Sequence, residues 1–155
     1  MSAPSIKEAR KKIYRFCAYQ ERSHKEVKDK LFEFGLRSEQ VNELVAHLIG
    51  EGFLNEERFA KVFAGGKFRL KKWGRLKIVH ELEARGLTDN CIRSGLKEID
   101  EREYAQLLSS LVKKKLNLLT DFNKFRLRDK VAKSIIRKGF EPEMVWNEVK
   151  KQLPD

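Results

Sequence analysis

Three stretches of this chain end in the same way, with an apolar helical pattern, a glycine and a further apolar residue. They read KLFEFGL, HELEARGL and SIIRKGF, and their glycines are Gly35, Gly86 and Gly139. Glycine just past a helix adopts a left-handed backbone without steric cost, and the apolar residue after it packs back on the last turn. The glycines lie 51 and 53 residues apart. Spacing this regular indicates a repeated unit of helices.

Apolar residues recur at helical spacing along the whole chain, as in Val41, Leu44, Val45 and Leu48. Gly52 marks a fourth helix end, and Asn55 and Asp100 have the position and side chains of helix N-caps. A single amphipathic helix cannot bury its apolar stripe alone, so the helices must pack in groups. We therefore predict an all-α fold with about nine helices, in an elongated tandem array of three-helix, helix-turn-helix-like repeats. The expected repeats are residues 5–53, 54–99 and 100–153, in a monomeric chain.

The charge of the chain indicates a polyanionic partner. The 155 residues carry a net charge of +11, with a pI near 9.7, and such proteins attract nucleic acid. The cations are concentrated in residues 67–77, which contain no acid, and in residues 113–138. Lysine and arginine bind phosphate by displacing condensed counterions, so we predict contact with single- and double-stranded DNA. The expected contact residues are Lys67, Arg69, Lys71, Lys72, Trp73, Arg75, Lys77, Lys113, Lys114, Lys115, Lys124, Arg126 and Arg128.

Two aromatic residues interleave the first basic segment. An aromatic ring flanked by cations can stack on an unpaired base, but it can equally belong to the core while the lysines reach past it to water. We expect Phe68 to be a core residue and leave both interpretations open for Trp73.

The residue pattern does not favour an enzyme. The sequence GGKF at 65–68 lacks the leading glycine, the following Ser or Thr and the preceding strand of a phosphate-binding loop. The histidines and cysteines have no metal-site spacing, and carboxylate pairs such as Glu56 and Glu57 lie where helix capping explains them. We therefore expect no catalytic residue, no metal and no cofactor. The absence of a long apolar run and of a secretory segment favours the cytoplasm and no membrane contact.

Four motifs, taken in order, resemble those of the RecX family of recombination regulators. They are RSHKEVKDKL at 22–31, GFLNEERFA at 52–60, WGRLKIVHELEARGL at 73–87 and IIRKGFEPEMV at 135–145. The resemblance implies a tandem three-helix-repeat protein that binds the filament of the RecA recombinase on DNA. It also implies that the protein limits filament growth, ATP hydrolysis and strand exchange in DNA recombination and repair. Asn55 and the pair Gly65-Gly66 depart from the residues usual in the family.

Two other functions remain as alternatives. Helix, glycine turn and helix also outline an independent helix-turn-helix DNA-binding protein. Such a protein would prefer one duplex sequence, but no Arg, Asn or Gln cluster is placed to contact base edges. A metal-dependent nuclease would need a carboxylate cluster for Mg²⁺, and the sequence offers none.

Overall fold

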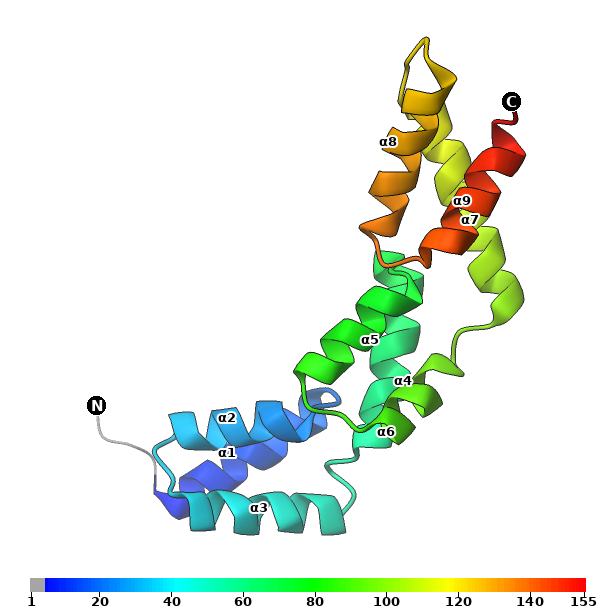
Figure 1. Ribbon diagram of the computed structural model, residues 1–155. Helices are drawn as coiled ribbons and strands as arrows, with labels where there is room; N and C mark the ends of the chain where they lie inside the picture. The colour runs from blue at the N-terminus through cyan, green and yellow to red at the C-terminus, as the bar shows by residue number, and fades with distance from the viewer. Residues whose placement is uncertain (1–4) are drawn as a thin grey trace. The chain divides into compact units, whose positions relative to one another are not determined.

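The computed structural model describes residues 5–155, and within this range the chain forms nine α-helices, one π-helical turn and no strand (Figure 1). The predicted all-α class and helix number are therefore confirmed. The elements are α1 (Ile6–Tyr19), α2 (His24–Glu33), α3 (Ser38–Gly50), α4 (Glu56–Gly66), the π-helical η1 (Lys67–Lys71), α5 (Arg75–Ala84), α6 (Asp89–Leu96), α7 (Glu101–Leu118), α8 (Lys124–Ile136) and α9 (Pro142–Gln152).

The helices end at the glycines that the sequence singles out. Gly35, Gly52, Gly86 and Gly139 have φ angles of 88°, 79°, 77° and 100°, in the left-handed region. At the first three, the amide of the next residue donates to a carbonyl in the last helical turn; the Leu36 N to Leu31 O distance, for example, is 3.3 Å. These bonds satisfy carbonyl groups that the helix leaves without partners.

The helix starts also follow the expected caps. The side chains of Asn55 and Asp100 accept hydrogen bonds from the amides of Arg58 and Glu103, at 2.9 and 3.0 Å. Each of these bonds satisfies an amide at the start of a helix, which is worth about 1 kcal/mol.

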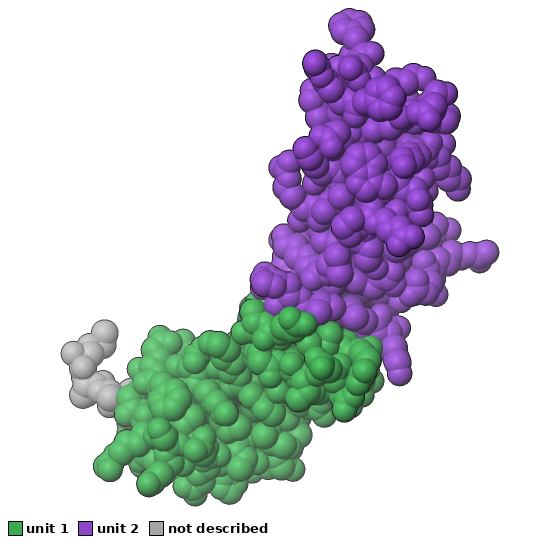
Figure 2. Space-filling view, viewed as in Figure 1, with its two compact units in different colours: residues 1–63, 82–95 green, residues 64–81, 96–155 purple. Residues whose placement is uncertain are grey.

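The chain divides into two compact units, drawn in different colours in Figure 2. Unit 1 comprises the residues up to 63 together with 82–95, and unit 2 comprises residues 64–81 and 96–155. The predicted boundaries of the three repeats and their elongated arrangement stay predictions.

Unit 1 has a core built from the apolar stripes of its first three helices. Each helix contributes residues at helical spacing, and the buried set is Ala9, Ile13, Cys17, Val27, Leu31, Leu36, Val41, Leu44, Val45, Leu48 and Leu54. In the same unit α6 approaches α4 closely, because a Cβ at Gly95 would lie 2.7 Å from the carbonyl oxygen of Ala60. A glycine is therefore needed where these two helices cross.

Unit 2 contains a bundle in which α7, α8 and α9 pack against one another (Figure 1). Its buried residues include Leu108 and Val112 of α7, Ile135 of α8 and Val149 of α9. Phe68 of η1 is also buried, with its ring 5.9 Å from that of Tyr104, so the predicted core role of Phe68 is confirmed. No helix among the described residues has the length and apolar character needed to span a membrane.

Candidate nucleic-acid interface

The basic segment 67–77 is joined to the turn between α8 and α9 by a close contact of two glycines. The amide of Gly74 donates to the carbonyl of Lys138 at 2.8 Å, and the amide of Leu76 donates to that of Gly139 at 2.9 Å. A Cβ at Gly74 would lie 2.3 Å from the backbone of Gly139. A Cβ at Gly139 would lie 2.3 Å from Cβ of Lys77 and 2.7 Å from its backbone nitrogen. Side chains are therefore excluded at both positions, and the start of α5 is fixed against the bundle.

Arg75 strengthens this contact from inside unit 2. Its Nε lies 2.8 Å from Oε2 of Glu141 and its Nη1 lies 2.6 Å from Oε1 of Glu101. Its backbone amide donates to the hydroxyl of Tyr104 at 3.0 Å, and that hydroxyl donates to Glu141. Burial raises the pKa of Tyr104, and the hydrogen bond to Glu141 raises it further. Burial by itself lowers the pKa of Arg75, but Glu141, Tyr104 and Glu101 outweigh burial and raise it overall.

Around this junction the structure brings together five lysines from three separate stretches of the sequence. Lys138 is half-buried at the end of α8, and burial lowers the pKa of its ammonium group. The nearby charges of Lys115, Lys72, Lys77 and Lys114 lower this pKa further, in that order. None of the five forms an ion pair with a carboxylate of the described chain. We call these five residues the lysine cluster.

Trp73 lies beside the lysine cluster and is half-buried. The Nζ atoms of Lys77 and Lys67 are 4.5 and 5.0 Å from the centroid of its ring, within the range of cation–π attraction. The ring thus holds two ammonium groups near the cluster. The sequence left open whether Trp73 is a core residue or an exposed ring that stacks on a base. The structure places it between the two, because the ring is neither in the core nor fully exposed.

An unusual backbone places Lys72 in the cluster. Helix α4 continues into the π-helical turn η1, and Lys72 follows it with φ 58° and ψ 41°, in the left-handed region. Its amide donates to the carbonyl of Lys67, as does that of Trp73. A residue with a Cβ pays about 1–2 kcal/mol for this conformation. The turn reverses the chain between α4 and α5 within three residues.

Several residues expected at the interface lie outside the lysine cluster. Arg69 and Lys71 are exposed on η1, and the Arg69 guanidinium lies over Gly65. Lys113 lines a separate hollow of about 500 Å³ near the end of α9. Lys124 and Arg126 are exposed at the start of α8, about 18 Å along the helix from the end that carries Lys138.

Two of the expected contact residues, Arg75 and Arg128, have partners within the fold. The Arg128 side chain is 7% exposed, its Nε lies 2.8 Å from the carbonyl oxygen of Leu153, and its Nη1 lies 2.7 Å from Asp155. These bonds, and those of Arg75 described above, hold the guanidinium groups in place. We therefore leave both arginines out of the proposed interface.

Lys138 is the member of the cluster that sequence reasoning did not place among the contacts. It belongs to the basic stretch 113–138 and comes directly before the glycine that ends α8. Its place in that basic stretch, directly before a glycine that ends a helix, was the available signal. The other four lysines were expected contacts, but their proximity to Lys138 could not be predicted from sequence, because they lie on other elements.

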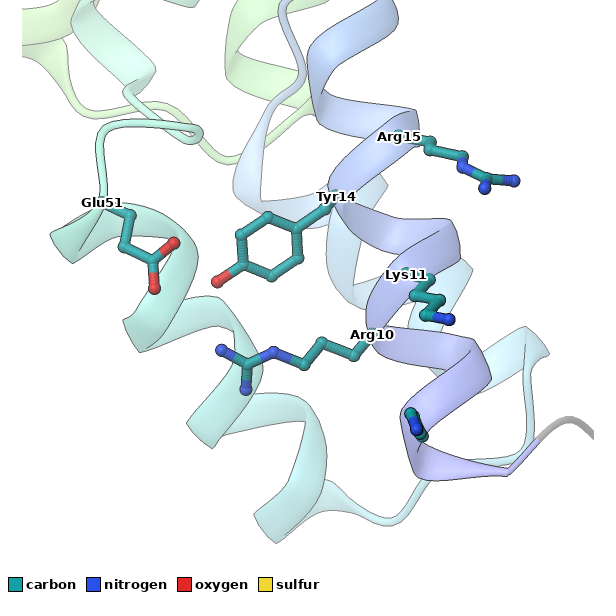
Figure 3. A pocket seen from close by; sticks show the side chains of 6 residues that line it. Arg10, Lys11, Tyr14, Arg15 and Glu51 are labelled. Atoms are coloured by element: carbon teal, nitrogen blue, oxygen red, sulfur yellow. The ribbon is translucent and has the colours of Figure 1, made fainter.

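A second basic hollow lies in unit 1 (Figure 3). It has a volume of about 590 Å³ and is lined on α1 by Lys7, Arg10, Lys11, Tyr14 and Arg15, and by Glu51 at the end of α3. The Tyr14 hydroxyl points toward Glu51 and Arg10 (Figure 3), and burial, followed by Glu51, raises its pKa. Sequence reasoning missed this hollow, because acidic residues elsewhere in 5–53 nearly balance the charge of α1.

The fold and its surfaces define a class: an all-α protein of short packed helices with a clustered lysine surface. Comparison with known proteins agrees with this class. The family model for the second three-helix domain of RecX matches residues 55–96, which run from α4 to α6. The regulatory protein RecX of Pelodictyon phaeoclathratiforme is 31% identical over 134 residues, which are 85% of this chain and 79% of that protein. The chain belongs to the RecX family.

Other relatives are longer than this chain. The RecX of Clostridium perfringens is 28% identical over 122 residues, and the match covers 77% of this chain but 57% of the relative. For the RecX of Oceanobacillus iheyensis the covered share is 48%. The chain thus spans about half the length of these relatives.

Solved structures support the fold. The crystal structure of RecX from Lactobacillus salivarius aligns with a TM-score of 0.84 over 96% of both chains, at 21% identity. Another crystal structure of regulatory protein RecX aligns with a TM-score of 0.83 at 20% identity. At this identity the likeness establishes the fold.

Proposed function

We propose that this protein regulates the RecA recombinase in the cytoplasm. It binds as a monomer to the RecA filament and to the DNA within it, and it limits ATP hydrolysis and strand exchange. Membership of the RecX family supports RecA as the protein partner. The lysine cluster supports a nucleic-acid contact through phosphates. Regulation of this kind acts by binding, so it requires no catalytic group.

The observation that carries the proposal is the convergence of five lysines without carboxylate partners. Holding like charges together costs free energy. Burial lowers the pKa of Lys138, and the four neighbouring lysines lower it further. A phosphate backbone relieves this repulsion and releases its own condensed counterions. An ammonium group is a point charge and lacks the planar pair of donors with which an arginine guanidinium recognises guanine. Lysines therefore favour contact with the phosphate backbone over recognition of a base sequence. This chemistry favours a filament regulator over an independent sequence-specific DNA-binding protein.

The test measures DNA-dependent ATP hydrolysis by the cognate RecA. We expect the wild-type protein to slow hydrolysis at substoichiometric ratios. The double variant Lys114→Gln, Lys115→Gln removes two charges of the cluster and should need several-fold more protein for the same effect. The matched control is Lys150→Gln, Lys151→Gln, which removes two exposed charges from α9. Absence of slowing at any ratio would refute the function, and equal losses in both double variants would refute the assignment to the cluster.

A further inference from the structure

Unit 2 carries two exposed phenylalanines where the chain passes from α7 to α8. Phe122 is fully exposed and Phe125 is 75% exposed. Leu118, at the end of α7, is 65% exposed. Large apolar side chains gathered at one exposed point commonly mark a binding surface. We call residues 118–127 the aromatic tip.

The backbone of the aromatic tip is held by polar groups and does not depend on the rings. Asp121 accepts hydrogen bonds from the amide of Asn123 at 2.9 Å and from Nζ of Lys130 at 3.0 Å. The Asn123 side chain accepts from the amides of Phe125 and Arg126, at 2.9 and 3.2 Å, and so caps α8. The turn thus keeps its shape while Phe122 projects into solvent. The exposed ring contributes nothing visible to the stability of the fold.

The surroundings of the two rings suit a flat apolar group. A hollow of about 740 Å³ is lined by Leu119, Thr120, Asp121, Phe122 and Leu127. Its volume lies in the range of about 300–1,000 Å³ usual for ligand sites. Behind Phe125 the guanidinium of the buried Arg128 lies 5.5 Å from the ring centroid and holds the ring from one side.

The charges at the aromatic tip identify the class of ligand. Lys124 and Arg126 alternate with the phenylalanines and are exposed, whereas the carboxylate of Asp121 is already bonded to Lys130. The backbone amide of Asn123, followed by Lys130, lowers the pKa of Asp121, so this carboxylate is engaged by the turn and by α8. Lys124 Nζ donates to the carbonyl oxygen of Pro154 at 3.5 Å, which leaves its charge without a carboxylate partner. The surface therefore offers positive charge together with aromatic faces. Single-stranded nucleic acid combines phosphates with unpaired bases and matches both, whereas duplex DNA keeps its bases stacked inside.

We propose that the aromatic tip binds single-stranded DNA by stacking unpaired bases on Phe122 and Phe125, while Lys124 and Arg126 contact the adjacent phosphates. This inference deepens the proposed function and rests on it, because it assigns a DNA contact at a site away from the lysine cluster. Phe122 forms the exposed platform, and Phe125 is the platform held by Arg128.

The test compares two strands of equal length and charge by fluorescence anisotropy: a labelled thymidine oligonucleotide and the same backbone with abasic sites. Stacking contributes about 1–3 kcal/mol per base, so Phe122→Ala should weaken binding to the thymidine strand about fivefold or more. Binding to the abasic strand should not change. Phe122→Trp should bind the thymidine strand with the affinity of the wild type, because an indole ring stacks on bases at least as strongly as a phenyl ring. The matched control is Leu70→Ala, which removes another side chain that is 82% exposed within a basic segment.

Three outcomes would overturn the inference. One is equal affinity of Phe122→Ala and wild type for the thymidine strand. Another is an equal loss on both strands, which would indicate damage to phosphate contacts. A third is a loss of RecA inhibition with unchanged binding to the strands, which would indicate a protein contact at the tip. If the wild type slows RecA, each of these outcomes contradicts base stacking at the aromatic tip and leaves the proposed function intact. Failure of the inference can thus be distinguished from failure of the proposed function.

Discussion

At the scale of single residues, arginine and lysine are used differently in unit 2. Arg75 and Arg128 direct their guanidinium groups into the fold, whereas Lys72 and Lys114 are exposed. The planar fork of arginine forms directed hydrogen bonds with carboxylates and carbonyls, which suits a fixed internal site. The ammonium group is compact, hydrated and mobile, which suits contact with the phosphates of a flexible strand. The residue type thus separates cations that stabilise the unit from cations available to a partner.

Lys72 gives a prediction at this scale, because its left-handed backbone makes stability and binding respond in different directions. The variant Lys72→Gly relieves a conformational cost of about 1 kcal/mol, so the free energy of unfolding should stay the same or rise. The affinity for single-stranded DNA should fall, because the variant removes a charge of the lysine cluster. Chemical denaturation and anisotropy titration measure the two quantities.

The control for this prediction is the same substitution one residue earlier. Lys71 has a helical backbone and lies outside the cluster. Lys71→Gly should lower the free energy of unfolding by about 1 kcal/mol and weaken DNA binding less than Lys72→Gly. A loss of stability in Lys72→Gly as large as that in Lys71→Gly would show that the left-handed turn does not favour glycine.

At the scale of elements, the approach of α5 to the α8–α9 turn determines where the basic segment lies. Gly74 and Gly139 allow the two backbones to touch, and Arg75 holds them together through Glu141. The lysine cluster depends on this junction, because Lys77 and Lys138 belong to the two touching segments.

We predict opposite effects for two alanine substitutions in this region. Gly74→Ala places a Cβ against the backbone of Gly139 and should lower the free energy of unfolding by about 2 kcal/mol or more. Gly66 has helical angles and open space around it, so Gly66→Ala should raise that free energy by about 0.5–1 kcal/mol. Thermal and urea denaturation of both variants check the signs. A stabilising Gly74→Ala would contradict the close contact.

The elements differ in how far sequence could predict them. The helix ends at Gly35, Gly52 and Gly86 follow from glycine and its immediate neighbours, so local reasoning located them. The need for glycine at position 74 arises from a backbone far away in sequence, and no local pattern reports it. The partners of Arg75 and Arg128 are also distant in sequence. The expected contact residues therefore included these two internal arginines together with surface lysines.

At the scale of the whole molecule, the net charge of +11 is distributed unevenly. The lysine cluster and the aromatic tip both lie in unit 2, and unit 1 has its own basic hollow on α1. Salt should therefore weaken the binding of a polyanion that is held by phosphate contacts. The steepness of this loss is proportional to the number of phosphates contacted.

This distribution predicts the salt dependence of DNA binding. The logarithm of the affinity for single-stranded DNA should fall linearly with the logarithm of salt concentration, with a slope of about −0.7 per contacted phosphate. Lys115→Gln should reduce the steepness by roughly that amount for one lost contact. Lys25→Gln should leave the slope unchanged, because Lys25 is paired with Asp29 at 2.8 Å in unit 1. Equal slopes for wild type and Lys115→Gln would exclude a phosphate contact at Lys115.

The junction at Arg75 also has a consequence for the order in which the parts of unit 2 come together during synthesis on the ribosome. Arg75 and its partner Glu141 are 66 positions apart, whereas each helix closes over a few residues. Domains form as their segments emerge during synthesis. The segment around Gly74 therefore has no contact with the α8–α9 turn while the chain from α6 to α8 is being synthesised. Unit 2 can close around Arg75 only after Glu141 has been translated.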